Sequence, residues 1–167
     1  MEKLVVYCHG YNSSANTDKV KILKDAGFSV YAWNINVDPT ISMPELESNV
    51  DSILLDRLNR EVELVFVGTS LGAWYASNLA EKYGARAVLV NPAYNPTTLL
   101  PTIGLDEKIA AKYDSIVINS NDDLIVAKDD ELIDHCRDWP DAKSVTISET
   151  GGHRFNGKEF QIVVDMI

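Results

Sequence analysis

The chain of 167 residues has only two cysteines, only three histidines and no long apolar run. Cys8 and Cys136 form no C-x-x-C pair and are too few for a disulfide framework, so we expect free thiols and a cytoplasmic location. No apolar stretch approaches the length of a membrane span, and the first residues lack the pattern of a signal peptide. We therefore expect no membrane partner.

Basic residues are also scarce, with 15 Lys and Arg against 25 Asp and Glu, which gives a formal net charge of −10. This charge argues against nucleic acid as a partner and favours a neutral or cationic small molecule. The histidines and carboxylates are dispersed, so no metal site is expected. Neither G-x-G-x-x-G nor a P-loop occurs, so no nucleotide cofactor is expected.

Short apolar runs alternate with helical patterns from end to end. The runs that favour strands are 4–8, 29–33, 62–67, 87–90, 115–119 and 144–147. Several of them are apolar almost throughout, which is typical of strands covered on both faces. The pattern predicts an α/β fold in one domain, residues 1–167. Its six-stranded parallel sheet, of order 2-1-3-4-5-6, would be flanked by helices on both faces.

Helical periodicity predicts helices at 17–26, from 42 onward, after Ser70 as far as Gly84, at 128–137 and after Asn156. Residues 91–112 are different, because three prolines and a glycine break any long element there. This stretch follows a strand and should emerge at the carboxyl edge of the sheet, where ligands bind in open α/β sheets. It is either an irregular loop or a small cap over the substrate.

The segment Gly68-Thr69-Ser70-Leu71-Gly72 lies between an apolar run and a helical pattern. Strand, G-x-S-x-G and helix in this order are typical of a nucleophilic serine on a sharp turn. The two glycines fit because neighbouring chain leaves no room for larger side chains. Ser70 is therefore the candidate nucleophile.

A nucleophilic serine needs a general base, and His153 is the preferred one. It lies in a glycine-rich loop between the last predicted strand and the last helix, from which it can reach over the sheet edge. His135 lies in an apparent helix, which favours a solvated surface role. His9, at the end of the first strand, is the remaining alternative.

The acid that orients the base should lie between Ser70 and His153. Asp122 and Asp123 follow the predicted strand 115–119. Asp123 is preferred because Ser120-x-x-Asp123-x-x-Val126 resembles the G-x-x-D-x-x-V acid loop of α/β hydrolases, and Asp122 stays as the alternative. The order serine, aspartate, histidine is that of the α/β-hydrolase triad. The oxyanion donors would be the backbone N–H groups of Leu71 and Tyr11.

Four segments together resemble the small bacterial YqiA-like esterases: 9–14, 68–76, 88–93 and 151–155. The resemblance implies a minimal single-domain α/β-hydrolase fold, activity on short-chain esters and no cofactor. By position it assigns Ser70 as nucleophile, His153 as base and Asp123 as acid. The chain departs from the family in having Ala73 where a second glycine is frequent, and in a shorter segment before the acid loop.

The expected function is therefore hydrolysis of short-chain carboxylic esters through a Ser-His-Asp triad and an acyl-enzyme. Two alternatives remain at this point. One is a thioesterase, which would use the same groups on a thioester. The other is a binding module that keeps the hydrolase fold without turnover, although a binding module has no need for all three triad groups.

Overall fold

A computed structural model describes residues 1–128, 130 and 141–167. Its sheet has six parallel strands in the order β2-β1-β3-β4-β5-β6, which confirms the predicted topology. The strands are β1 (Glu2–Cys8), β2 (Ser29–Ala32), β3 (Val62–Thr69), β4 (Arg86–Val90), β5 (Asp123–Ala127) and β6 (Ser144–Ser148). The helices are α1 (Asp18–Asp25), α2 (Pro39–Leu55), α3 (Leu71–Tyr83), α4 (Pro96–Thr102), α5 (Glu107–Ala110), the 3₁₀ turn η1 (Gly157–Phe160) and α7 (Gln161–Met166).

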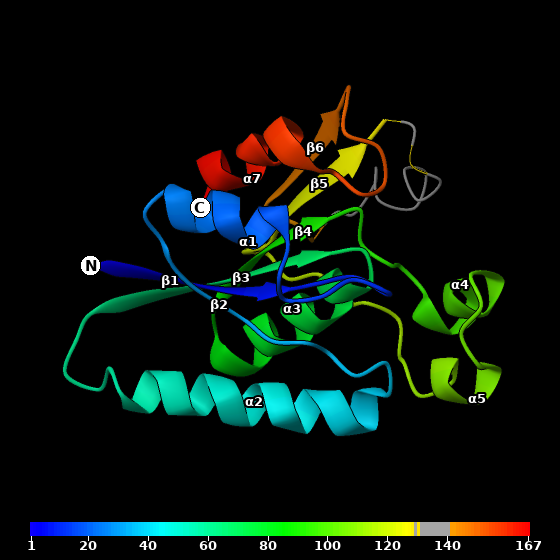
Figure 1. The fold of residues 1–167 in the computed structure, drawn as a ribbon, viewed down its shortest axis with the longest axis horizontal. Coiled ribbons are helices and arrows are strands. Elements are labelled where there is room, and N and C mark those ends of the chain that lie inside the picture. The colour runs from blue at the N-terminus through cyan, green and yellow to red at the C-terminus, as the bar shows by residue number, and fades with distance from the viewer. Residues whose placement is uncertain (129, 131–140) are drawn as a thin grey trace.

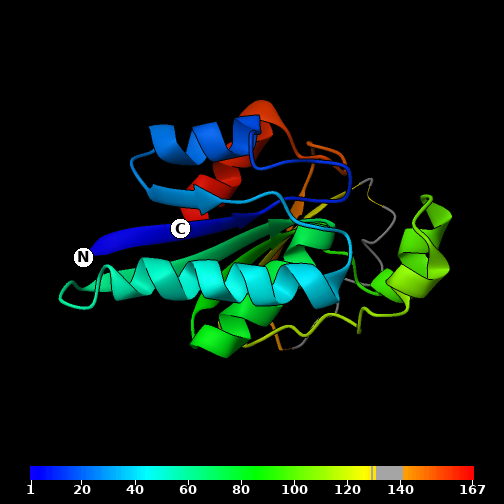
Figure 2. The ribbon, with the colours of Figure 1, turned by 60° about the horizontal axis from the view of Figure 1, so that its bottom comes forward.

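Helices cover both faces of the sheet (Figures 1 and 2). On one face α2 and α3 bury a cluster that includes Val50, Phe66 and Leu79. On the other face α1 and α7 bury a cluster that includes Leu23, Val67 and Val163. This two-sided cover explains why β1, β3, β4 and β5 read as nearly continuous apolar runs rather than as alternating ones.

One predicted helix begins earlier than expected, and another lies almost wholly outside the described residues. Helix α2 begins at Pro39 and not near Ser42, because the Asp38 carboxylate caps it by accepting a hydrogen bond from the Thr40 N–H, with Pro39 as the first helical residue. The predicted helix 128–137, with His135 and Cys136, lies almost wholly outside the described residues. Among the residues that are described, no helix is both long and apolar enough to cross a membrane.

The predicted strand 115–119 is wrong, because the fifth strand is β5, eight residues further along. Residues 115–119 lie outside the sheet in a segment without regular secondary structure, which contacts α3. The Trp74 indole N–H donates to the Asp114 carbonyl, and the Ser77 hydroxyl donates to the Val117 carbonyl. Ile116 and Ile118 are buried while Val117 is exposed, so this alternation belongs to a segment with one buried side. Every residue of β5, in contrast, is buried.

Candidate active site

Ser70 lies between the end of β3 and the first residue of α3, with φ 57° and ψ −119°. This backbone conformation is strained for a residue with a side chain, and strain of this kind occurs at functional turns. Three backbone hydrogen bonds hold it. The Ser70 N–H donates to the Val90 carbonyl at 2.9 Å, and its own carbonyl accepts from Ala73 and Ala93 at 3.1 Å each. The turn is thus fixed by β4 and by the loop that follows β4.

The two glycines of the G-x-S-x-G pattern are required by close approach of the backbone. A Cβ atom on Gly68 would lie 2.2 Å from the carbonyl oxygen of Gly72. A Cβ atom on Gly72 would lie 2.0 Å from the carbonyl oxygen of Cys8 in β1. Neither distance is compatible with any side chain, so strand β3, helix α3 and strand β1 can meet beneath Ser70 only with glycine at both positions.

His153 lies beside Ser70, as the sequence predicts. Its Nε2 atom is 3.0 Å from the Ser70 hydroxyl oxygen, and its Nδ1 atom is 2.5 Å from a carboxylate oxygen of Asp130. The Asp130 side chain is only 1% exposed, whereas the His153 side chain is 51% exposed. A buried carboxylate, an imidazole and a serine hydroxyl therefore form one continuous chain of hydrogen bonds, open to solvent at the histidine.

Asn91 fixes the loop that carries His153. It is fully buried at the end of β4, and its side-chain amide donates to the carbonyls of Gly152 and His153 at 2.9 Å. Its side-chain oxygen accepts from the Ala127 N–H at 2.8 Å, at the end of β5. Asn91 therefore ties the histidine loop to two strand ends. A polar residue directly after an apolar strand is the sequence signal that could indicate this role.

The structure contradicts the prediction that Asp123 orients the histidine. Asp123 is the first residue of β5, and its carboxylate accepts from the Ser144 hydroxyl at 2.6 Å and lies 3.4 Å from an Arg86 guanidinium nitrogen. In the sheet register Arg86 pairs with Val65 and Val90 with Thr69, so Arg86 lies at the end of the sheet away from Ser70. The carboxylate in contact with His153 belongs to Asp130, three residues beyond the end of β5.

The alternative Asp122 is also excluded as the partner of His153. It is fully buried, and its carboxylate accepts from the backbone N–H groups of Ala87 and Asn119 at 3.0 and 2.9 Å. These bonds join the start of β4 to the turn before β5. Despite them, burial raises the pKa of the Asp122 carboxyl above its ordinary value.

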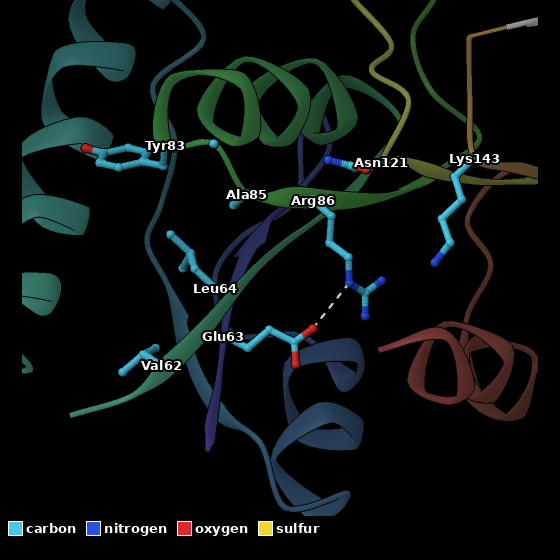
Figure 3. Close-up of a pocket in the computed structure, with 9 residues that line it drawn as sticks. Val62, Glu63, Leu64, Tyr83, Ala85, Arg86, Asn121 and Lys143 are labelled. Atoms are coloured by element: carbon cyan, nitrogen blue, oxygen red, sulfur yellow. Dashed lines mark ion pairs between the residues drawn. The ribbon is translucent and has the colours of Figure 1, made fainter.

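A hollow of about 430 Å³ lies at the amino-terminal ends of the strands, and Arg86, the ion-pair partner of Asp123, lines it (Figure 3). Arg86 points into it and pairs with Glu63 at 3.5 Å between the Arg86 Nε and a Glu63 carboxylate oxygen. Lys143 also points toward it. The charge of Asp123 is thus balanced by Arg86 and Lys143 at the amino-terminal ends of the strands, and its carboxylate is not available to His153.

The predicted oxyanion loop lies directly against the serine. A Cβ atom on Gly10 would be 3.2 Å from the Thr69 carbonyl oxygen and 3.5 Å from the Ser70 Cβ. Tyr11 follows, and it lines the same cavity as Ser70. Leu71 is the first residue of α3, so no carbonyl of that helix can accept its N–H. Leu71 thus directly follows Ser70 and Tyr11 lines its cavity, and the catalytic role of their N–H groups stays a prediction.

His9 supports this loop and is not a second base. Its Nε2 accepts a hydrogen bond from the Ile35 N–H at 2.9 Å, so the proton is on Nδ1, which donates to the Gly10 carbonyl at 2.7 Å. The side chain is only 7% exposed. Burial lowers the pKa of His9 below its ordinary value, against the opposing effect of the Gly10 bond.

The lowered pKa predicts how stability depends on pH. Because the folded protein resists protonating His9, the unfolded chain binds the extra proton first, so this contribution to the free energy of unfolding is complete above the unfolded pKa of about 6.5. It is lost as pH falls below that value toward the folded pKa. Urea unfolding between about pH 5 and pH 8 should show wild type losing more stability on acidification than His9→Gln. Parallel pH profiles for the two proteins would contradict the prediction.

Ser70 and His153 open onto a cavity of about 340 Å³. Its wall comes from the oxyanion loop, the start of α1, the histidine loop and Ile103, which follows α4. Helices α4 and α5 lie beyond the carboxyl ends of the strands (Figure 1). Within the described ranges, no group of three or more His, Cys, Asp or Glu residues is arranged to hold a metal ion.

The fold is that of the α/β hydrolases. The chain matches an esterase from Pyrococcus furiosus with a TM-score of 0.73 at 15% identity, over 99% of this chain and 80% of the other. It matches a soluble variant of the monoglyceride lipase from Saccharomyces cerevisiae with a TM-score of 0.72 at 14% identity, over 99% and 85%. It also matches mouse alpha/beta hydrolase domain-containing protein 10, with a TM-score of 0.62 at 16% identity, over 98% and 87%.

Residues 4–163 match the model of an uncharacterised protein family, UPF0227. The chain belongs to this family, which confirms the resemblance to the YqiA-like proteins.

Proposed function

We propose that this chain is a serine hydrolase that cleaves short-chain carboxylic esters through an acyl-enzyme. The observation that carries the proposal is the chain of hydrogen bonds from Ser70 through His153 to the buried carboxylate of Asp130. A binding module would have no use for this arrangement. Weaker support comes from the structural neighbours, among which are proteins named as esterases and lipases.

In the proposed reaction the Ser70 oxygen attacks the ester carbonyl carbon while its proton passes to Nε2 of His153. Asp130 holds the Nδ1 proton of the imidazole and stabilises the imidazolium that forms. The N–H groups of Leu71 and Tyr11 donate to the oxyanion of the tetrahedral intermediate. His153 then gives its proton to the leaving alcohol as the ester C–O bond breaks, which leaves the acyl group on Ser70. Water attacks the acyl carbon while giving a proton to His153, and the carboxylic acid leaves as His153 returns that proton to the Ser70 oxygen.

The volume of the cavity and the segment beside it indicate the size of the substrate. A volume of about 340 Å³ is near the small end of the range for ligand pockets, which supports a short acyl chain. We propose that residues 91–112 act as a small cap within one α/β-hydrolase domain formed by residues 1–167, since Ile103 of this segment lines the cavity. A cytoplasmic location is part of the proposal, and the free, buried thiol of Cys8 supports it.

A series of 4-nitrophenyl esters from acetate to dodecanoate tests the proposal. We expect kcat/KM to be highest for the short acyl chains and to fall by at least about tenfold for the longest, because one buried methylene contributes about 0.8 kcal/mol only where there is room for it. A butyryl thioester assayed beside the butyrate ester decides between the two substrate types. No hydrolysis of any member, or a maximum at the longest chain, would contradict the proposal.

A further inference from the structure

Lys19, the second residue of α1, is a buried cation in the wall of the cavity that holds Ser70 and His153. It is only 7% exposed. Removing an ammonium group from water is costly, so buried lysines are normally paired with a carboxylate. The partner of Lys19 therefore shows whether its charge is already neutralised by the protein.

The partners of Lys19 are neutral groups. Its Nζ donates to the side-chain oxygen of Asn156 at 2.7 Å and lies 6.0 Å from the centroid of the Phe160 ring. Within the part of the chain that the structure describes, it forms no ion pair with a carboxylate. The half-buried guanidinium of Arg86, in contrast, pairs with both Glu63 and Asp123. The ammonium group of Lys19 is thus held in place by neutral partners, without a direct ion pair.

A second cation lines the same cavity. Arg154 follows His153 directly and is exposed. Burial lowers the pKa of Lys19, the Asp18 carboxylate opposes this effect, and repulsion from Arg154 adds a smaller lowering. Asp18 also lines the cavity, but it is exposed and its carboxylate accepts from the Gly157 N–H at 2.9 Å. An anion bound by Lys19 and Arg154 would weaken the repulsion between these two cations. It would also give the buried ammonium group of Lys19 a partner of opposite charge.

We propose that Lys19 and Arg154 form a subsite that binds an anionic group, a carboxylate or a phosphate, on the substrate that Ser70 attacks. The inference depends on the proposed function and adds to it the charge of the substrate. It also reverses the expectation drawn from total composition. A net charge of −10 favours neutral or cationic partners, but the wall of this cavity carries an excess of positive charge.

Matched ester pairs test the subsite in turnover. In one pair, 4-nitrophenyl butyrate and 4-nitrophenyl hemisuccinate, the anion is on the acyl part. In the other, phenyl butyrate and 4-carboxyphenyl butyrate, it is on the alcohol part. Wild type should prefer the anionic member of one pair. Lys19→Met should lower kcat/KM for that member by about 10- to 100-fold, since a lost hydrogen bond to a charged group has this effect, and should change the neutral member by less than about threefold.

Control variants distinguish an effect of the Lys19 charge from a loss of folding. Lys19→Arg should recover most of the preference, and Lys21→Met, an exposed position on the same helix, should leave it unchanged. Circular dichroism shows whether each variant is folded. Equal losses on neutral and anionic esters in Lys19→Met would overturn the inference while leaving the esterase proposal intact.

Binding without turnover separates the two proposals. Titration calorimetry with glutarate and with inorganic phosphate at low ionic strength should show binding of one of them to wild type. That binding should weaken in Arg154→Gln, disappear in Lys19→Met and decrease with added salt. The anion that binds identifies the group. If neither anion binds, or if binding is unchanged in both variants, the subsite does not exist, whether or not esters are hydrolysed.

Discussion

Ser70→Ala is expected to lower kcat for a 4-nitrophenyl ester by about 10⁴- to 10⁶-fold, as loss of the nucleophile does in serine hydrolases. The reason is that the Ser70 hydroxyl is the group within 3.0 Å of the His153 Nε2. Alanine keeps the Cβ atom, so the φ of 57° becomes no more strained and the fold should persist. The measurement is kcat by absorbance at saturating ester, with labelling by a fluorophosphonate as a second readout.

A matched control for this prediction is Ser52→Ala. Ser52 lies on the exposed side of α2 and its hydroxyl donates to the Ser48 carbonyl, so both turnover and labelling should stay near wild type. Covalent labelling that persists in Ser70→Ala, at another serine, would remove Ser70 from the mechanism. Labelling that disappears together with turnover would support it.

Asp130→Asn should lower kcat by about 10³- to 10⁴-fold with a much smaller change in KM. An asparagine can hold the His153 ring but neither fixes the correct tautomer nor stabilises the imidazolium as a carboxylate does. Because Asp130 acts through His153 and does not touch the substrate, the rate of fluorophosphonate labelling should fall in parallel with kcat. Both rates can be measured on the same preparation.

Asp123→Asn is the matched control, and its effects should be opposite. Asp123 accepts from Ser144 and pairs with Arg86, so its loss should lower the melting temperature while kcat stays within a few-fold of wild type. Normal turnover in Asp130→Asn together with a collapse in Asp123→Asn would reject the geometry found here. It would restore the assignment made from sequence spacing.

The nucleophile and the base could be predicted from sequence because their signals are local. Gly68 and Gly72 are needed because β3, α3 and β1 approach so closely that a Cβ atom at either position would lie 2.0 to 2.2 Å from a carbonyl oxygen. The serine between the two glycines is thereby marked in the sequence. His153 lies in a loop with positive φ at Gly151 and Gly152, and such a loop is recognisable from its glycines. The parallel sheet followed in the same way from alternation of buried runs and helical patterns.

The acid could not be found in this way, because its position depends on which apolar run enters the sheet. Residues 115–119 and β5 are both short and rich in β-branched residues, and periodicity does not separate them. If residues 115–119 are taken as the fifth strand, Asp123 follows that strand. In the structure, however, Asp123 is the first residue of the fifth strand, β5. Only the pairing of β5 with β4 and β6 brings Asp130, and not Asp123, to the carboxyl edge beside His153.

The sequence by itself thus determined the fold class and the turn that presents Ser70, since each depends on residues close together in the chain or on a pattern repeated along it. Tertiary structure alone decided the partner of His153, the anchoring of its loop by Asn91 and the meeting of Lys19 with Arg154 in one cavity. These contacts join residues 23 to 135 positions apart. Their geometry follows from sheet register and helix packing, which no local pattern encodes.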